Sequence, residues 1–194
     1  MAKNRNLIRN TSYNFKLRSR PSFFIGTYII VGSFLINTLL SGFATDSSPF
    51  SFLTVNFLEL FVITITVLCI SFSLFALFFG SRRFQRKIGN KVWNKNSKKM
   101  MWILFSLIII LYFVEFYLLR TGEEAFIIPT FIISYAILLL VLNFSKTIPL
   151  YQFSIACFLI GFTPLLVDEF GFNALIILGV AHYVYAISQT KKRD

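Results

Sequence analysis

Two carboxylates and one imidazole lie inside long apolar stretches of this 194-residue chain. Aromatic and aliphatic residues surround Glu59 and Glu115, as in the run YFVEFYLL around Glu115. His182, the only histidine, lies in the last apolar run. Ionisable groups within a membrane segment are costly, and they commonly bind ions or relay protons. These three residues are therefore the first candidates for chemistry.

A polar stripe accompanies Glu59. Thr66 and Ser73 follow it at successive intervals of seven residues, so the three side chains share one face of a helix. A small, polar stripe on a membrane helix usually faces other helices or a water-filled path. The pattern fits either a path for a cation or close helix packing, in which each hydroxyl bonds to its own backbone.

Further acidic residues lie in two short segments between apolar runs: Glu123, Glu124, Asp168 and Glu169. If the helices close around them, these residues, Asp46, Glu59 and Glu115 would form an acidic vestibule for protons, a metal cation or an organic cation. The alternative is that they are ordinary loop acids and that Glu115 pairs with Arg120 or Tyr112. The sequence leaves both interpretations open.

Signatures of catalysis are missing from the sequence. It has no P-loop, no GxSxG, no HExxH and no Cys/His dyad. Cys69 and Cys157 fall within apolar runs, where a cysteine usually acts as a small apolar residue. We therefore expect no catalytic residue, no resident metal and no cofactor.

The composition indicates the elements that must position these residues. Hydrophobic residues make up 56% of the chain and charged residues 14%, and the mean hydropathy is +0.72. A soluble domain would have about 25% charged residues. Here the charges separate apolar runs of about 20 residues, the length that crosses a bilayer as a helix. The sequence predicts an all-α integral membrane protein with about six transmembrane helices.

The six predicted spans form one membrane domain over residues 22–188, between a basic tail at 1–21 and another at 189–194. A basic loop is predicted at 80–100, and Pro164 is expected to kink or loosen the last turn of its helix. Prolines near the starts of three spans fit first helical turns. The spans are about 22–43, 54–79, 101–119, 125–143, 149–167 and 170–188.

Basic residues set the orientation. Of the 19 lysines and arginines, Arg120 alone lies in a segment on the acidic side. By the positive-inside rule, both termini and the loop 80–100 are cytoplasmic. A rival interpretation makes the first span a cleaved signal peptide, which would leave five spans in the same orientation.

Depth then separates the three candidates. Glu59 and Glu115 each lie within roughly 6–8 Å of the outer boundary, at about 1.5 Å of rise per residue. Their side chains can reach the interface, which weakens the functional inference. His182 lies nearer the cytoplasmic side with Gly179 and Ala186 on its face. It is a candidate for a proton site or for a neutral, hydrogen-bonded histidine at a tight helix contact.

Three classes of function follow. We expect first a non-catalytic membrane subunit or scaffold that assembles with itself or with a larger complex. The second is a small transporter or channel for a cation, a proton or a cationic solute. The third is a metal-dependent membrane enzyme. Topology and anionic lipid explain the basic segments better than nucleic acid does. The short loops favour the cytoplasmic membrane of a bacterium.

Overall fold

The computed structural model describes residues 17–43, 54–87, 95–142, 148–167 and 170–191. These residues form six α-helices and one short 3-10 helix, so the predicted all-α class is confirmed. The elements are α2 (Ser19–Phe43), α3 (Val55–Lys87), α4 (Lys95–Thr121), η1 (Glu124–Phe126), α5 (Ile127–Leu142), α6 (Ile148–Leu166) and α7 (Gly171–Lys191).

Four of the helices are long and apolar enough to cross a membrane, within α2, α3, α4 and α7. Helices α5 and α6 contain shorter apolar stretches, Ile127–Val141 and Leu150–Leu166. At about 1.5 Å per residue, α5 is only about 24 Å long, less than the roughly 30 Å of a typical hydrocarbon core. A short apolar helix can be accommodated by local thinning of the bilayer or by its neighbours.

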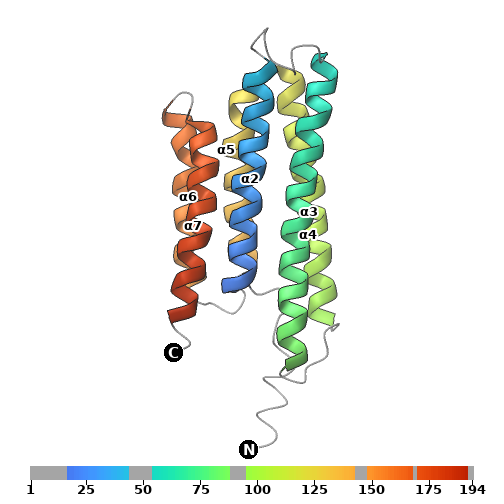
Figure 1. The fold of residues 1–194 in the computed structure, drawn as a ribbon. Coiled ribbons are helices and arrows are strands. Elements are labelled where there is room, and N and C mark those ends of the chain that lie inside the picture. Colours follow the sequence, from blue (N-terminus) through green and yellow to red (C-terminus); the bar gives the residue numbers. More distant parts are fainter. Residues whose placement is uncertain (1–16, 44–53, 88–94, 143–147, 168–169, 192–194) are drawn as a thin grey trace, which may run out of the picture.

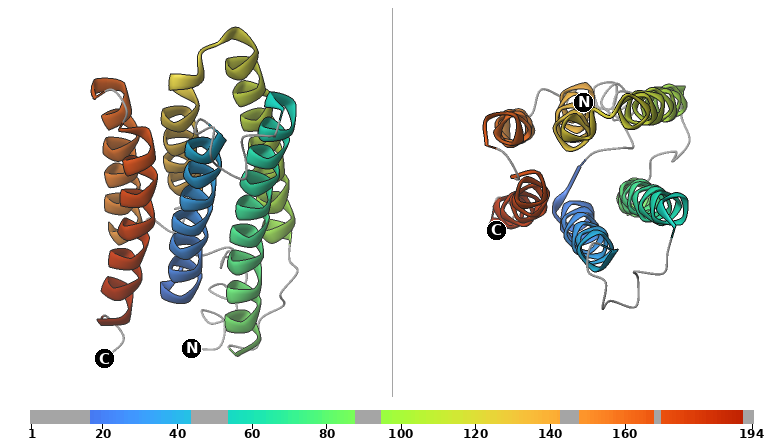
Figure 2. Two further views of the ribbon diagram at one scale, coloured as in Figure 1. Left: turned by 45° about the horizontal axis from the view of Figure 1, so that its top comes forward. Right: turned by 90° about the horizontal axis from the view of Figure 1, so that it is seen from above.

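The six helices lie roughly side by side and form an open ring in the view from above (Figures 1 and 2). Helix α2 packs against α7 and α3, and α5 packs against α6 and α4. Contacts between α6 and α7 join the two groups. The order round the ring is therefore α3, α2, α7, α6, α5 and α4.

The core lies between α2, α5, α6 and α7. Its fully buried side chains include Ile25, Ile132, Cys157 and Leu178, one from each of these helices. Helices α3 and α4 contribute few buried side chains, because most of their apolar surface faces outward. The fold thus consists of a packed group of four helices with two peripheral helices.

Glycines bring α2 and α7 into close contact. A Cβ atom added at Gly26 would lie 2.7 Å from the backbone oxygen of Gly179 and 2.9 Å from the Cβ of His182. A Cβ at Gly179 would collide with Ile30 of α2. Small residues at a helix interface allow the two backbones to approach in this way.

Local sequence signals explain where the helices begin and end. Pro21, Pro129 and Pro149 lie in the first turns of α2, α5 and α6, where a missing N–H costs little. Gly122 adopts a φ of 78° after α4, and the N–H of Glu123 donates to the carbonyl of Leu118 over 2.9 Å. This is the glycine-capped helix end that sequence alone can indicate.

Pro164 lies within α6, two residues before the helix ends at Leu166. Proline has no N–H, so the carbonyl of Ile160 lacks its usual helical donor. The hydroxyl of Thr163 donates to that carbonyl over 2.7 Å. The freed backbone acceptor is thus satisfied within the helix, as an apolar environment requires.

The predicted basic loop 80–100 is largely helical. Helix α3 continues to Lys87 rather than ending near residue 79, and α4 begins at Lys95 rather than residue 101. Arginine, lysine and glutamine are good helix formers, and basic side chains at a helix C-terminus interact favourably with its dipole. Residues 88–94, which include Gly89 and Asn90, lie outside the described residues.

The close contact between α2 and α7 predicts that a glycine-to-alanine substitution there lowers stability, the reverse of its usual effect in a helix. Gly→Ala within a helix normally stabilises by about 0.5–1 kcal/mol. We expect Gly26→Ala instead to destabilise by roughly 1–3 kcal/mol, because the new methyl meets backbone atoms that cannot move aside. Thermal unfolding of the purified protein in detergent measures the change. Val31→Ile adds a methyl at an exposed position of the same helix and should have little effect. A Gly26→Ala variant as stable as the wild type would refute the close contact.

Candidate functional site

His182 lies at the centre of a hydrogen-bonded cluster that joins three helices. Its Nδ1 lies 2.9 Å from the hydroxyl of Ser22 on α2, and its Nε2 lies 2.7 Å from the hydroxyl of Tyr135 on α5. The side chains of Ser22 and His182 are completely buried. The cluster therefore connects α2, α5 and α7 at a point that solvent does not reach.

The number of available protons determines which atom donates in each hydrogen bond of the cluster. The hydroxyl of Ser22 also lies 3.0 Å from the backbone oxygen of His182, to which it donates its single hydrogen. Nδ1–H must then donate to the oxygen of Ser22, and the hydroxyl of Tyr135 donates to Nε2. Every donor has an acceptor in this arrangement, and the imidazole is the neutral Nδ1–H tautomer.

Aromatic rings and small residues enclose the imidazole. The ring of Phe153 on α6 meets the imidazole edge-on, with ring centroids 4.8 Å apart. The ring of Tyr185 in turn stacks on the ring of Phe153, with centroids 4.7 Å apart. Gly26 lies against the Cβ of His182. Close by, the hydroxyls of Thr27 and Tyr183 are 3.0 Å apart and form a further hydrogen bond between α2 and α7. The cluster is thus part of the packed core.

This geometry does not favour nucleophilic catalysis by Ser22. A catalytic serine must transfer its proton to a basic nitrogen of the histidine. Here Nδ1 donates to Ser22, and the serine proton is directed at a backbone carbonyl. A substrate would also need access to an oxygen atom that is completely buried. The arrangement instead suits a fixed polar link between helices.

Glu115 lies on the inward stripe of α4. Its immediate neighbours Val114 and Phe116 are exposed, whereas Glu115 is half-buried. Buried or less exposed residues recur with it at intervals of three and four residues along one stripe of the helix: Ser97, Met100, Leu104, Ile108, Leu111 and Leu118. A carboxylate on this stripe is directed toward the inside of the bundle rather than toward its surroundings.

Arg120 is not the partner of Glu115 in the described structure. Its guanidinium group lies over the ring of Phe116, with the Cζ atom of Arg120 5.2 Å from the ring centroid. The residue is exposed at the end of α4. Arg120 therefore forms a cation–π contact instead of the ion pair that the sequence left open.

The polar stripe of α3 bonds to its own helix. Thr66 donates to the carbonyl of Val62 at 2.9 Å, and Ser73 donates to the carbonyl of Cys69 at 2.7 Å. Cys69 lies between them in the sequence, and its sulfur atom contacts Gly32 and lies 3.4 Å from the backbone oxygen of Tyr28, both on α2. Contacts of this kind are expected if the stripe serves close helix packing rather than a path for a cation.

The remaining acidic candidates are not brought together among the described residues. Glu123 is exposed in the turn after Gly122. The side chains of Glu59 and Glu124, and all of Asp46, Asp168 and Glu169, lie outside the described part of the chain. Within that part, no group of three or more His, Cys, Asp or Glu residues could hold a metal ion.

Sequence reasoning found His182 but not its two partners. Ser22 and Tyr135 lie 160 and 47 residues away along the chain, so no spacing links them. The available signal was a tyrosine in the apolar segment ISYAILLL and a serine directly after Pro21. Both need internal partners in an apolar environment.

Removal of one partner should be costly. We expect Tyr135→Phe to lower the free energy of unfolding by about 1–3 kcal/mol, because Nε2 is left buried without a donor. Tyr112→Phe removes the same hydroxyl from an exposed position of α4 and should leave stability unchanged. Thermal unfolding in one detergent compares the two variants. Equal melting temperatures for Tyr135→Phe and Tyr112→Phe would show that the bond contributes nothing.

Comparisons with protein families, with curated proteins and with solved structures find no match for this chain.

Proposed function

We propose that the chain is a non-catalytic subunit or scaffold of a bacterial cytoplasmic membrane. In this proposal all six helices cross the bilayer, both termini are cytoplasmic, and the bundle assembles with itself or with a larger membrane partner. The observation that carries it is the outward-facing apolar surface of α3 and α4.

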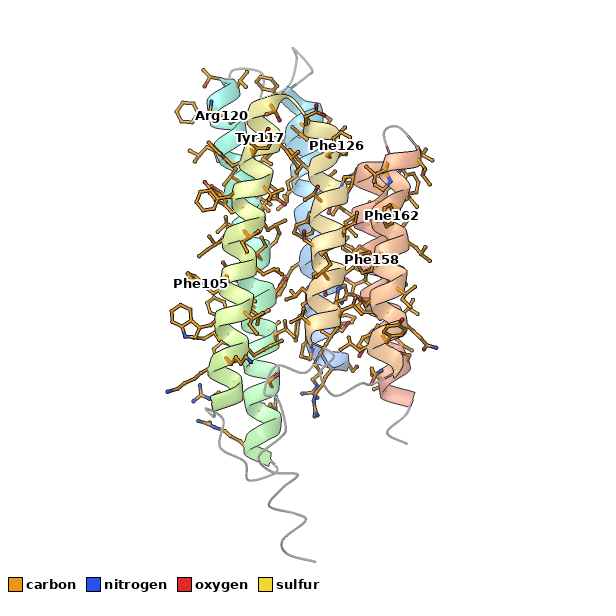
Figure 3. All side chains as sticks on the ribbon, turned by 180° about the vertical axis from the view of Figure 1, so that it is seen from behind. Phe105, Tyr117, Arg120, Phe126, Phe158 and Phe162 are labelled. Atoms are coloured by element: carbon orange, nitrogen blue, oxygen red, sulfur yellow. The ribbon has the colours of Figure 1, made fainter. Side chains whose placement is uncertain are left out.

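That surface is too large and continuous to face water. Along α4, the exposed fractions are 65% for Trp102, 56% for Phe105 and 64% for Phe113. Figure 3 shows Phe105 on the outer side of this helix. Along α3, Phe61, Phe75 and Phe79 are similarly exposed. Contiguous apolar surface on this scale is typical of contact with lipid or another protein.

The distribution of charge supports the orientation. Helix α2 begins, α3 ends, α4 begins and α7 ends at one end of the bundle (Figure 1). That end carries exposed Arg83, Arg86, Lys98 and Lys99. Glu123 lies at the opposite end, after α4. Basic residues mark the cytoplasmic side of membrane proteins.

The closed cluster around His182 supports a structural role. An ion pathway or a catalytic centre needs polar atoms that a solute can reach. The one histidine is completely buried, and both of its ring nitrogens have hydrogen-bond partners. Such polar links between helices stabilise and align a bundle within lipid.

A second candidate function rests on Glu115. A carboxylate on the inward stripe of a membrane helix could bind a proton or cation, as a small transporter or channel requires. The bonds of Thr66 and Ser73 to their own helix lend this candidate no further support. It therefore ranks below the scaffold. The metal-dependent enzyme ranks third, because the described residues offer no ligand set.

The proposed assembly has a direct test. After gentle extraction from native membranes, the intact particle should have a mass well above the 22.4 kDa of one chain. Mass spectrometry of its components then distinguishes a homo-oligomer from a complex with a stoichiometric partner. A particle that contains a single chain would contradict the scaffold.

Variants of two glutamates separate the scaffold from the transporter. The scaffold predicts that Glu115→Gln leaves the assembled particle and cation or proton flux in vesicles unchanged. A transporter predicts that Glu115→Gln reduces flux to background, whereas Glu123→Gln, at an exposed position beyond the helix, retains it. Melting temperature is measured in parallel, so that a loss of flux is not confused with a loss of folding.

A further inference from the structure

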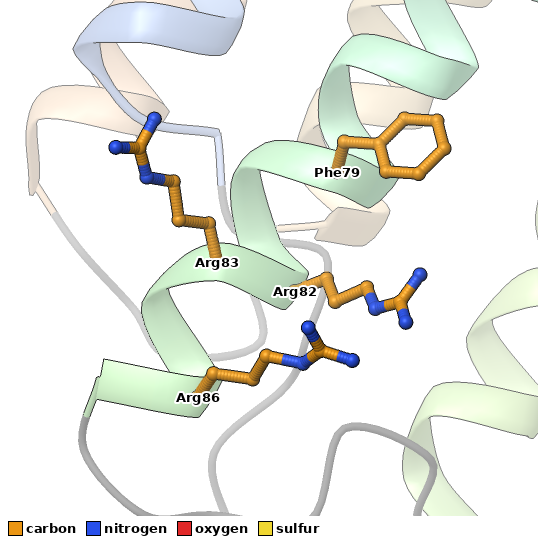
Figure 4. A pocket seen from close by; sticks show the side chains of 4 residues that line it. All are labelled: Phe79, Arg82, Arg83 and Arg86. Carbon is orange, nitrogen blue, oxygen red and sulfur yellow. The ribbon is translucent and has the colours of Figure 1, made fainter.

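Three arginines gather at the cytoplasmic end of α3. Together with Phe79, Arg82, Arg83 and Arg86 line an open hollow of about 600 Å³ (Figure 4). Arg82 is half-buried, whereas Arg83 and Arg86 are exposed. Guanidinium groups present several N–H donors in a planar fork that fits phosphate and carboxylate oxygens.

Two of these arginines share a face with Phe79. The intervals from Phe79 to Arg82 and from Arg82 to Arg86 are three and four residues, which place all three side chains on one side of the helix. Figure 4 shows Arg82 and Arg86 extending to the same side as Phe79, with Arg83 directed away from them. The hollow is therefore asymmetric, with a pair of cations beside an aromatic ring.

An aromatic stripe continues from this pair along α3. Phe75 and Phe72 precede Phe79 at intervals of four and three residues, on the same face. The three rings are about half-exposed, at 48% for Phe72 and 55% for both Phe75 and Phe79. Phe75 and Phe79 also contact each other, with centroids 6.2 Å apart. Apolar surface thus leads directly to the two guanidinium groups.

The charge of this site has no acidic counterpart nearby among the described residues. Glu115 and Glu123, whose side chains the structure describes, lie in the last turns of α4 and just after it. Those positions are at the opposite end of the bundle from the end of α3 (Figure 1). An external anion would therefore balance the pair of arginines.

We infer that Arg82 and Arg86 bind the phosphate of an anionic glycerophospholipid, while an acyl chain lies along Phe79, Phe75 and Phe72. The apolar segment of α3 ends at Arg83, so the two guanidinium groups lie at the level of lipid headgroups. The inference rests on the proposed membrane location. It adds a defined lipid site, with a known pair of ligands, to the general attraction of basic residues for an anionic surface.

Lipid fits the site better than a soluble anion or a nucleic acid. Free phosphate would occupy the arginines and leave the aromatic stripe uncovered. Nucleic acid could stack on one ring, but the stripe runs away from the basic end and into the apolar segment of α3. A molecule with a phosphate at one end and a long apolar chain matches both parts.

The test measures lipid retention by native mass spectrometry. Full-length protein is stripped of lipid in dodecylmaltoside and then titrated with phosphatidylglycerol or with phosphatidylcholine of the same acyl chains. We expect the wild type to prefer phosphatidylglycerol. We expect R82Q and R86Q each to weaken that binding roughly fivefold, the loss of about one surface cation near anionic lipid. The double variant should lose the preference.

Lys98 provides the control. K98Q removes one exposed positive charge from the same end of the bundle, on α4 and away from the residues that line the hollow, and it should retain the preference. If K98Q and R82Q weaken binding equally, general electrostatic attraction explains the data and the site is refuted. Phosphatidylglycerol binding by the R82Q/R86Q double variant equal to that of the wild type would also refute it.

Two further arms identify the ligand class. Inorganic phosphate or a short RNA at a concentration similar to that of the lipid should not displace phosphatidylglycerol, and displacement by either one overturns the lipid assignment.

Alkaline carbonate extraction of cell membranes tests the membrane location of the protein separately. Release of the wild type would refute the membrane proposal itself, whereas wild type that stays in the membrane but shows no headgroup preference would refute only the lipid site.

Discussion

The hydrogen bonds of His182 are the interaction on which the packed part of the bundle depends. An imidazole in an apolar core needs a partner for each ring nitrogen, and each partner comes from another helix. Ser22 fixes α2 relative to α7, and Tyr135 fixes α5 relative to α7. Apolar side chains alone tolerate sliding and rotation, whereas these bonds are satisfied in one register only.

The close approach of α2 and α7 at Gly26 and Gly179 makes that register possible. Ser22 can contact both Nδ1 and the backbone oxygen of His182 only if α2 and α7 approach closely. Gly26 and Gly179 allow the approach, because neither places a Cβ between the two backbones. Polar bonding and close packing are therefore one structural unit. Within it, the histidine is completely buried and both of its ring nitrogens have hydrogen-bond partners, an arrangement that suits alignment of helices better than proton transfer.

The same arrangement explains the uneven surface of the molecule. Helices α2, α5, α6 and α7 satisfy one another, so α3 and α4 are added at the edge and bury little of their surface. Their outward apolar faces need lipid or protein, and their basic ends need anions. The proposed assembly uses both helices and the proposed phospholipid site uses α3, while the His182 cluster lies apart from them. In this proposal, stability and interaction depend on different helices of the ring.

The sequence alone was sufficient for properties that depend on neighbouring residues. It determined the helical class and the approximate extent of each apolar helix, because hydropathy over about 20 residues is a local quantity. It also located first turns at Pro21, Pro129 and Pro149, since the fit of proline in a first turn depends on local backbone geometry. It failed at residues 80–87 and 95–100, where charge was taken as a sign of a loop although these residues continue the helices.

Only the tertiary structure decided which polar side chains meet. His182 was recognisable as an exception in an apolar run, but its partners on α2 and α5 depend on how three distant helices pack. The inward position of Glu115 likewise depends on which face of α4 meets the bundle. The pairing of Arg82 with Arg86, rather than Arg83, depends on side-chain direction at the end of α3. The sequence determined the helices and their charge because those are local properties, whereas the candidate sites arise from contacts between helices and from the direction of side chains.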